Sequence, residues 1–449
     1  MKKNTPAFTL IELVIVMAVI AAVAGLTLGG FADNLAQDRQ RETAARGNMV
    51  REALTGGRDP DGVSRFLNDM GRWPRVPAAA FAADGAGREL GELYDPAVFA
   101  WDNGECRMLM QYCGAGGRSL VKPELKNFGL EPAPGNGLPD AVDMGQTMLR
   151  VGWKGPYINV PAAENPKFYD GWGNPWHAYD AAGAEIGGGN ARAPIYGIAS
   201  FGANNLDDES NGDTEYADCD QEFSLAPGEN TLASLQVELR LRAREEPKGW
   251  KNFTALEDVK FAEIPAYTPG RQYDAGDVVK VAEGAVTHYY QSAVKNNALA
   301  PFAGTEPDYQ NPTPGWRYAG RENGGVYEEW SLVNGVTVLL YAPAEIERGK
   351  LMDIGFFRFS KCGAQTDAPR RFRNDGSVLD DGGDPTPEVE FTGFSAARLS
   401  CLVPGRRPVC AAVYLETAGR YPVLFTAPLE TAVLRPGGSH LVLYLERQK

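Results

Sequence analysis

The chain contains 449 residues, and its 58 acidic and 44 basic side chains give a formal net charge of −14. This length is typical of about three domains, and the negative charge argues against binding to nucleic acid, whose phosphates would be repelled. Hydrophobic residues make up 43% of the chain, which excludes a wholly disordered protein. Only three histidines occur, far apart in the chain, so a histidine-rich metal centre is not expected.

The N-terminal segment is the most informative part of the sequence. Residues 8–30 are apolar apart from two threonines and Glu12, a length that can cross the bilayer core as a helix. Lys2 and Lys3 precede it, and such charges stay in the cytoplasm, which places the rest of the chain outside. A signal peptide or a plain membrane anchor has a similar apolar run. Glu12 argues against both, because a carboxylate in such a span is costly and needs a partner.

The run AFTLIEL at residues 7–13 resembles the cleavage site of type IV prepilins and type II secretion pseudopilins. The resemblance implies that prepilin peptidase cuts between Ala7 and Phe8 and methylates the new amino group. It also implies that Glu12 directs assembly with other pilin or pseudopilin subunits, by pairing with the Phe8 ammonium of a neighbour. Ala7 stands where the family usually has glycine and keeps the small size.

The residues after the apolar segment favour a continuing helix. Residues 31–53 contain many helix formers and no proline, and the pair Gly56-Gly57 is expected to end the helix. A second, short helix is predicted within residues 64–74, stopped by Gly71 and Pro74. The face of the long helix that we expect to pack on a sheet consists of Leu35, Ala36, Ala44, Ala45, Met49 and Ala53.

Two segments further along resemble the head of the major pseudopilin of type II secretion. The run DGWGNPW at 170–176 is similar to a signature turn of that protein, and we interpret it as a packed turn without chemistry. The run SFGAN at 200–204 resembles the opening of the pseudopilin calcium loop, and Asp218 resembles its closing acid.

Acidic and amide side chains crowd residues 204–218, and Ca²⁺ prefers six to eight such oxygens. A solvated acidic loop would have the same composition. The predicted calcium ligands are Asn204, Asp207, Asp213 and Asp218. Asn204 replaces the aspartate usual in the family, and the spacing does not decide among Asp207, Asp208 and Asp213.

The C-terminal half has the pattern of strands separated by turns. The run from VPGRRPVCAAVYLE to LRPGGSHLVLYLE, residues 403–446, resembles transthyretin-like β-sandwiches. The expected strands are 235–241, 331–341, 409–416, 422–425 and 441–446. No acid, base and nucleophile converge in the sequence, so we predict that the protein is not an enzyme.

Residues 267–320 resemble a chitin-binding type of carbohydrate-binding module, on Tyr273 and the runs AGDVV (275–279), YYQSA (289–293) and PGW (314–316). The resemblance implies a three-stranded module that binds chitin or another glycan through Tyr289, Tyr290 and Trp316. Aromatic rings that stack on sugar must be exposed, whereas rings that form the core of so small a module must be buried.

Six cysteines lie beyond the apolar segment in what should be an oxidising compartment, so disulfides are expected. Cys106 and Cys113 are the predicted pair, from proximity alone. No C-x-x-C motif occurs, which disfavours zinc and redox roles.

The predicted fold class is α+β, with a long N-terminal membrane helix running into a pseudopilin-like head, followed by an all-β sandwich carrying a small β module. The predicted segments are a leader (1–7), a membrane and spine helix (8–57), the head (58–228), the sandwich (229–266 and 321–449) and the carbohydrate-binding-module-like insert (267–320).

The predicted function is that of a minor or tip subunit of a type II secretion pseudopilus or type IV pilus-like fibre, because so large a head would crowd the shaft. One alternative is a pilin-anchored adhesin or glycan-binding protein displayed by the fibre, and a second is an anchored enzyme with a site that the sequence does not reveal. The expected partners are prepilin peptidase, other pilin or pseudopilin subunits and the membrane. The expected location is the inner membrane, single-pass, with the head in the periplasm or extracellular on a fibre.

Overall fold

The structure is a computed structural model. It describes residues 10–56, 62–99, 118–130, 144–160, 167–188, 193–207, 219–228, 231–241, 264–274, 277–292, 294, 296–302, 312–323, 326–328, 335–347, 351–362, 365–379, 384–414 and 423–447. The chain forms two compact units, and each is described by itself. The first comprises residues 1–51, 75–94 and 158–226, and the second comprises residues 52–74, 95–157 and 227–449.

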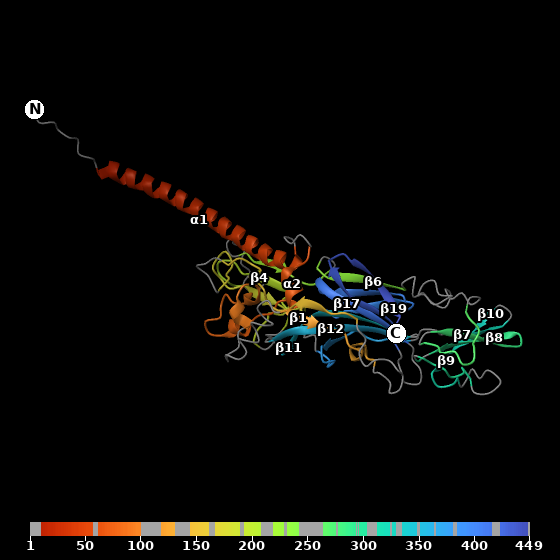
Figure 1. Cartoon of the computed structure of the whole chain (residues 1–449). Coiled ribbons are helices and arrows are strands. Elements are labelled where there is room, and N and C mark those ends of the chain that lie inside the picture. The colour runs from red at the N-terminus through yellow and green to blue at the C-terminus, as the bar shows by residue number, and fades with distance from the viewer. Residues whose placement is uncertain are drawn as a thin grey trace, which may run out of the picture. The chain divides into compact units, whose positions relative to one another are not determined.

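The helix α1 (Leu10–Thr55) is one continuous element, seen in red in Figure 1. Glu12 lies in its first turn, where the positive end of the helix dipole stabilises a carboxylate. The helix stops at Gly56, which has a φ of 73° and donates its N–H to the carbonyl of Glu52. Glycine adopts this left-handed conformation without strain, so the predicted helix end is confirmed.

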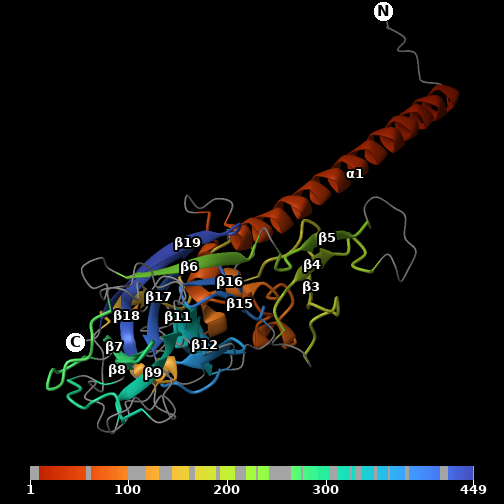
Figure 2. The same ribbon diagram turned by 90° about the vertical axis from the view of Figure 1, so that its right-hand side faces the viewer.

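The first unit contains a small antiparallel sheet in the order β3-β4-β5, visible side by side in Figure 2. Its strands are β3 (His177–Tyr179), β4 (Gly197–Ser200) and β5 (Gln221–Ser224). Two 3-10 turns, η1 (Ala78–Phe81) and η2 (Gly91–Leu93), accompany it. Phe168 and Trp176 are both buried and stack with ring centroids 6.3 Å apart, so aromatic rings fill much of this unit's interior.

The second unit is built around one ten-stranded sheet, in the order β13-β12-β11-β17-β18-β19-β6-β16-β15 with β14 paired to β12. The strands are β6 (Ala233–Leu241), β11 (Gly335–Glu347), β12 (Leu351–Cys362), β13 (Gln365–Thr366), β14 (Arg370–Arg373), β15 (Glu388–Thr392), β16 (Ala396–Leu402), β17 (Gly405–Tyr414), β18 (Val423–Leu434) and β19 (Ser439–Arg447). The strands predicted at 235–241 and 441–446 lie within β6 and β19.

The central strands of this sheet bury side chains on both faces. In β11, Val336, Val338 and Leu340 enter the larger core, while Leu339 and Tyr341 enter a second core on the opposite face. Successive strand residues point to opposite faces, so an unbroken apolar run suits a strand covered on both sides.

The second core is closed by short elements from residues 118–151. They are β1 (Arg118–Val121), η4 (Leu125–Phe128) and β2 (Thr147–Arg150), and β1 and β2 form a two-stranded antiparallel sheet. The second unit also contains α2 (Arg65–Met70) and η3 (Pro96–Phe99). The predicted short helix within 64–74 is therefore confirmed.

A separate four-stranded sheet, in the order β10-β9-β8-β7, forms from the segment that resembles a carbohydrate-binding module. Its strands are β7 (Val278–Glu283), β8 (Val286–Ser292), β9 (Trp316–Asn323) and β10 (Val326–Glu328). Tyr273, Val279, Tyr290 and Trp316 form its small core.

The predicted fold class is wrong in two respects. Strand is the dominant secondary structure of the described residues, and the arrangement is not the expected α+β pseudopilin-like head followed by a sandwich of two separate sheets. The physical reason is β18, in which Phe425 pairs with Val413 of β17 on one side and with Arg447 of β19 on the other. Parallel pairing of β19 with β6 then makes one sheet continuous around the larger core.

The expectation of a membrane-spanning helix also needs correction. Within the part of the chain that the structure describes, no helix has both the length and the apolar character needed to cross a bilayer. The predicted span begins at Phe8, and residues 8 and 9 lie outside the described residues.

Candidate functional site

The first part of α1, residues 10–23, presents an apolar surface on all sides. Every side chain from Leu10 to Val23 is exposed, and each large apolar one has at least 45% of its surface accessible. These apolar residues are Leu10, Ile11, Leu13, Val14, Ile15, Val16, Met17, Val19, Ile20 and Val23. A helix that is apolar all round is normally covered by lipid or by other helices. This surface is therefore the first candidate for contacts outside the chain.

Glu12 is a carboxylate within this apolar surface. Its neighbours Ile11 and Leu13 are both more than half exposed. If lipid or other helices cover the surface, water leaves the carboxylate and a positively charged partner becomes necessary. The predicted processing residues Ala7 and Phe8 lie outside the described residues.

The C-terminal half of α1 docks through a largely polar stripe. Its buried members are Gln40, Thr43, Arg46, Gly47 and Val50, at helical spacing. The predicted apolar packing face is only partly right, because Leu35 is 55% exposed and Ala45 is exposed, whereas the other four predicted residues are half-buried. Hydrogen bonds of Thr43 and Arg46 act together with apolar burial of Val50 to select the face that packs.

The turn at residues 170–175 is the surface against which this stripe rests. The backbone N–H of Gly171 donates to Thr43 Oγ1 at 2.9 Å, and Arg46 Nη1 donates to the Tyr169 carbonyl at 2.7 Å. A Cβ at Gly171 would overlap the carbonyl oxygen of Arg39, so only glycine allows this approach. The turn thus holds the helix, which agrees with its interpretation as a packed structural element.

Asp170 organises the turn from within. Its Oδ1 accepts the N–H groups of Trp172 at 2.9 Å and Asn174 at 2.8 Å, and its Oδ2 accepts the Ser200 hydroxyl at 2.6 Å. Burial raises the pKa of Asp170, while these hydrogen bonds oppose the shift. Asn174 Nδ2 donates to the Gly202 carbonyl at 2.7 Å, so the turn is also tied to the loop after β4.

The predicted calcium loop is only partly described. Asp213 and Asp218 lie outside the described residues, as does Asp208. Asn204 Oδ1 accepts the N–H of Leu206 at 2.9 Å, which closes a tight turn at the start of the loop. No group of three or more His, Cys, Asp or Glu side chains suited to a metal occurs among the described residues. Calcium binding stays a prediction.

The predicted sugar-binding rings are buried. Tyr289, Tyr290 and Trp316 are each at most 1% exposed, and Trp316 Nε1 donates to the Leu299 carbonyl at 2.8 Å. Their assignment as stacking residues is wrong, because a pyranose cannot reach a ring face inside the core. Small modules need aromatic residues for folding, which accounts for Tyr290 and Trp316 in the core of the four-stranded sheet. Tyr289 instead packs in the larger core of the second unit.

Two of the cysteines in the described part of the chain carry unreactive thiols. Cys401 and Cys410 are free thiols, and burial raises the pKa of both. A raised pKa keeps a thiol protonated and unreactive. The predicted pair Cys106 and Cys113 lies outside the described residues.

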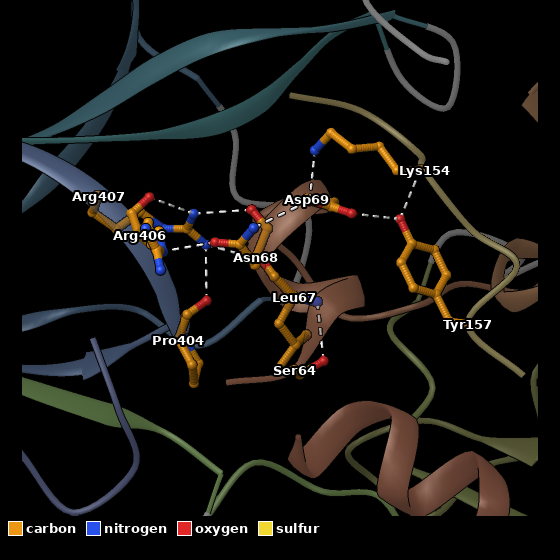
Figure 3. A network of polar contacts seen from close by, with 9 residues as sticks. All are labelled: Ser64, Leu67, Asn68, Asp69, Lys154, Tyr157, Pro404, Arg406 and Arg407. Carbon is orange, nitrogen blue, oxygen red and sulfur yellow. Dashed lines mark hydrogen bonds and ion pairs between the residues drawn. The ribbon is translucent and has the colours of Figure 1, made fainter. Parts of the chain in front are cut away.

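The helix α2 is capped at its N-terminus by the adjacent Ser64 and at its C-terminus by a side chain from a distant strand (Figure 3). Ser64 Oγ accepts the N–H of Leu67 at 3.2 Å and donates to the carbonyl of Ala53 at 2.7 Å. Ser64 therefore caps α2 and ties it to the last turn of α1. At the other end, Gly71 adopts a φ of 66° and donates to the Leu67 carbonyl.

Arg407 of β17 completes the C-terminal cap of α2. Its guanidinium is fully buried and donates to the carbonyls of Leu67 (2.9 Å) and Asn68 (3.0 Å) in α2. It also donates to the carbonyls of Pro404 (2.9 Å) and Arg406 (3.2 Å) (Figure 3). Burial lowers the pKa of Arg407 to about 9, which still leaves it charged at neutral pH. A cation at a helix C-terminus interacts favourably with the helix dipole.

Asp69 fastens α2 to the segment after β2. It accepts Lys154 Nζ at 2.5 Å on one oxygen and the Tyr157 hydroxyl at 3.1 Å on the other (Figure 3). The backbone N–H of Lys154 donates in turn to the Tyr157 hydroxyl oxygen at 2.8 Å. Burial lowers the pKa of Lys154 and raises that of Tyr157. Within this unit the network fixes the segment that follows α1.

The comparisons with known proteins concern the N-terminus. Residues 2–28 match the prokaryotic N-terminal methylation motif. The chain therefore carries a type IV prepilin-like signal, of the kind processed by prepilin peptidase. The motif also supports anchoring at a membrane through the N-terminus and interaction with pilin-like subunits. No curated protein and no solved structure matches the chain.

Proposed function

We propose that this protein is a prepilin-peptidase-processed subunit that joins a type II secretion pseudopilus or type IV pilus-like fibre as a minor or tip component. The observation that carries the proposal is the exposed apolar surface of α1 at residues 10–23, directly within the methylation motif. A fibre built from such helices buries this surface in its core, at about 25 cal/mol per Å² of apolar area.

The charge chemistry supports the same assembly. Cleavage between Ala7 and Phe8 would create a new ammonium group at the N-terminus of the mature chain. In an apolar bundle, that ammonium and the Glu12 carboxylate of a neighbour compensate each other, whereas either charge alone would be costly to bury. The pair thereby favours the register in which both charges meet.

The size of the remaining chain supports a terminal position. Residues 56–449 follow α1, and each such mass must clear its neighbours in a helical shaft. A subunit at the tip meets neighbours on one side only, so a large head is tolerated there.

Incorporation of Glu12 variants into fibres tests the proposal. In cells that express the peptidase and the other fibre subunits, we expect Glu12→Ala to be processed but to fall at least about tenfold in sheared fibres, because one partner of a buried charge pair is missing. Asp33→Ala is the matched control, since Asp33 is an exposed acid further along the same helix. Wild-type incorporation of Glu12→Ala would contradict the assembly role.

A further inference from the structure

Two arginines face each other across neighbouring strands of the large sheet. Arg358 of β12 is directly opposite Arg370 of β14 in an antiparallel pair. Side chains at opposite positions project from the same face of a sheet, and like charges there are destabilising. In a chain with a net charge of −14, this local concentration of positive charge is unusual.

The Arg358 guanidinium is held in place by its surroundings. Its central carbon lies 4.2 Å from the centroid of the Phe372 ring, a stacked cation–π arrangement. Gly129 also lies close to it, because an added Cβ there would come within 2.8 Å of Nη1. Phe372 and Gly129 therefore fix the plane of the guanidinium before any ligand arrives.

No protein group in the described residues uses the donors of this guanidinium. The Arg358 side chain makes no hydrogen bond or ion pair there, although it is partly buried. Desolvation by burial lowers its pKa, and Arg370 acts in the same direction, while Asp367 opposes the shift electrostatically without forming an ion pair. Nearby Lys126, by contrast, is already paired with Glu124 at 2.8 Å. The N–H groups of the Arg358 guanidinium are thus fixed in position and available to a ligand, and the exposed Arg370 is next to them.

We propose that Arg358 and Arg370 form an oxyanion-binding site, which takes a carboxylate or phosphate group in a bidentate contact with Arg358. A planar guanidinium matches the two oxygens of such a group, and the added negative charge removes the repulsion between the arginines. The oxyanion has two possible sources with the same chemistry: an acidic side chain of a second copy of this acidic chain, or free phosphate. The site is independent of the proposed fibre function.

The test uses the full chain in detergent micelles with ¹⁵N-labelled arginine. The Nε–H signal of Arg358 is assigned by its loss in Arg358→Lys, and inorganic phosphate is titrated against chloride at matched ionic strength. We expect a saturable shift with phosphate alone, and about a tenfold weaker Kd in Arg370→Gln, which loses the second charge. Arg398→Gln is the control, because Arg398 lies on β16 opposite Glu390 and should leave the Kd unchanged.

A dilution series without phosphate separates the two sources. A concentration-dependent shift that phosphate reverses identifies the second copy as the ligand, whereas a shift with phosphate alone identifies the free anion. Both results support the site. The absence of a phosphate-specific shift, or an unchanged Kd in Arg370→Gln with unaltered melting temperature, would overturn it.

Discussion

Replacing Arg407 with methionine tests whether its guanidinium stabilises α2. The variant keeps a long apolar side chain but removes the donors to four backbone carbonyls. All four carbonyls lose a charged donor, and the Leu67 carbonyl still accepts the backbone N–H of Gly71. A hydrogen bond to a charged group contributes about 1.5–3 kcal/mol, and apolar burial of methionine offsets part of the loss. We expect a net destabilisation of about 3–5 kcal/mol.

Hydrogen exchange measured by mass spectrometry localises this effect. A loss of that size should speed exchange in peptides covering residues 65–71 by roughly two to four orders of magnitude. Arg406→Met is the matched control, since Arg406 is the preceding residue of β17 and its side chain is exposed. Its cost should stay within about 0.5 kcal/mol. Equal exchange in the two variants would refute the capping role of Arg407.

Three further predictions concern the first unit. Gly171→Ala should lower the free energy of unfolding by about 1–3 kcal/mol, because its Cβ overlaps the Arg39 carbonyl; an unchanged urea midpoint would rule out this close approach. The pKa of Asp170 is raised in the native state. As the pH falls from 7, Asp170 therefore binds a proton in the native state at a higher pH than in the unfolded state, and this binding stabilises the native state. In urea melts, the free energy of unfolding of the wild type should therefore rise relative to that of Asp170→Asn as the pH falls. A difference between the two proteins that does not change with pH would contradict the raised pKa. Ca²⁺ at about 100-fold over its Kd should add about 2.7 kcal/mol of stability, measured by thermal melts against chelator, and an equal response in Asp218→Ala would argue against the loop.

Local patterns predicted the elements whose cause is local. The many helix-forming residues predicted α1, and the glycines Gly56 and Gly71 predicted the ends of α1 and α2. Alternation of apolar and polar residues located β6. These features depend on residues that are close together in the chain, so a single sequence is enough to predict them.

The contacts that position α1 were not predictable in the same way. Its buried stripe contains Gln40, Thr43 and Arg46, which a hydrophobicity pattern places in solvent. Their burial depends on partners more than 120 residues away, as the bond from Arg46 to Tyr169 shows. The prediction of sugar-binding residues in the four-stranded sheet was wrong for a related reason. The same aromatic rings suit either a sugar-binding face or a buried core, and the sequence does not distinguish the two.

A signal for Arg407 does exist in the sequence. It stands at the start of a strand in register with Val409, Ala411 and Val413, which all face the larger core. A charged residue at an inward position of a strand predicts a buried, hydrogen-bonded group. Its acceptors in α2 lie about 340 residues earlier, so the signal indicates a partner without identifying it.

The mass of the mature N-terminus tests the central claim most directly. The chain is expressed with and without prepilin peptidase, purified from membranes, and its N-terminal peptide is analysed by mass spectrometry. The account predicts that with the peptidase the chain begins at a methylated Phe8, and that without it residues 1–7 are retained. A start at any other residue, or an uncut chain in the presence of an active peptidase, would contradict it.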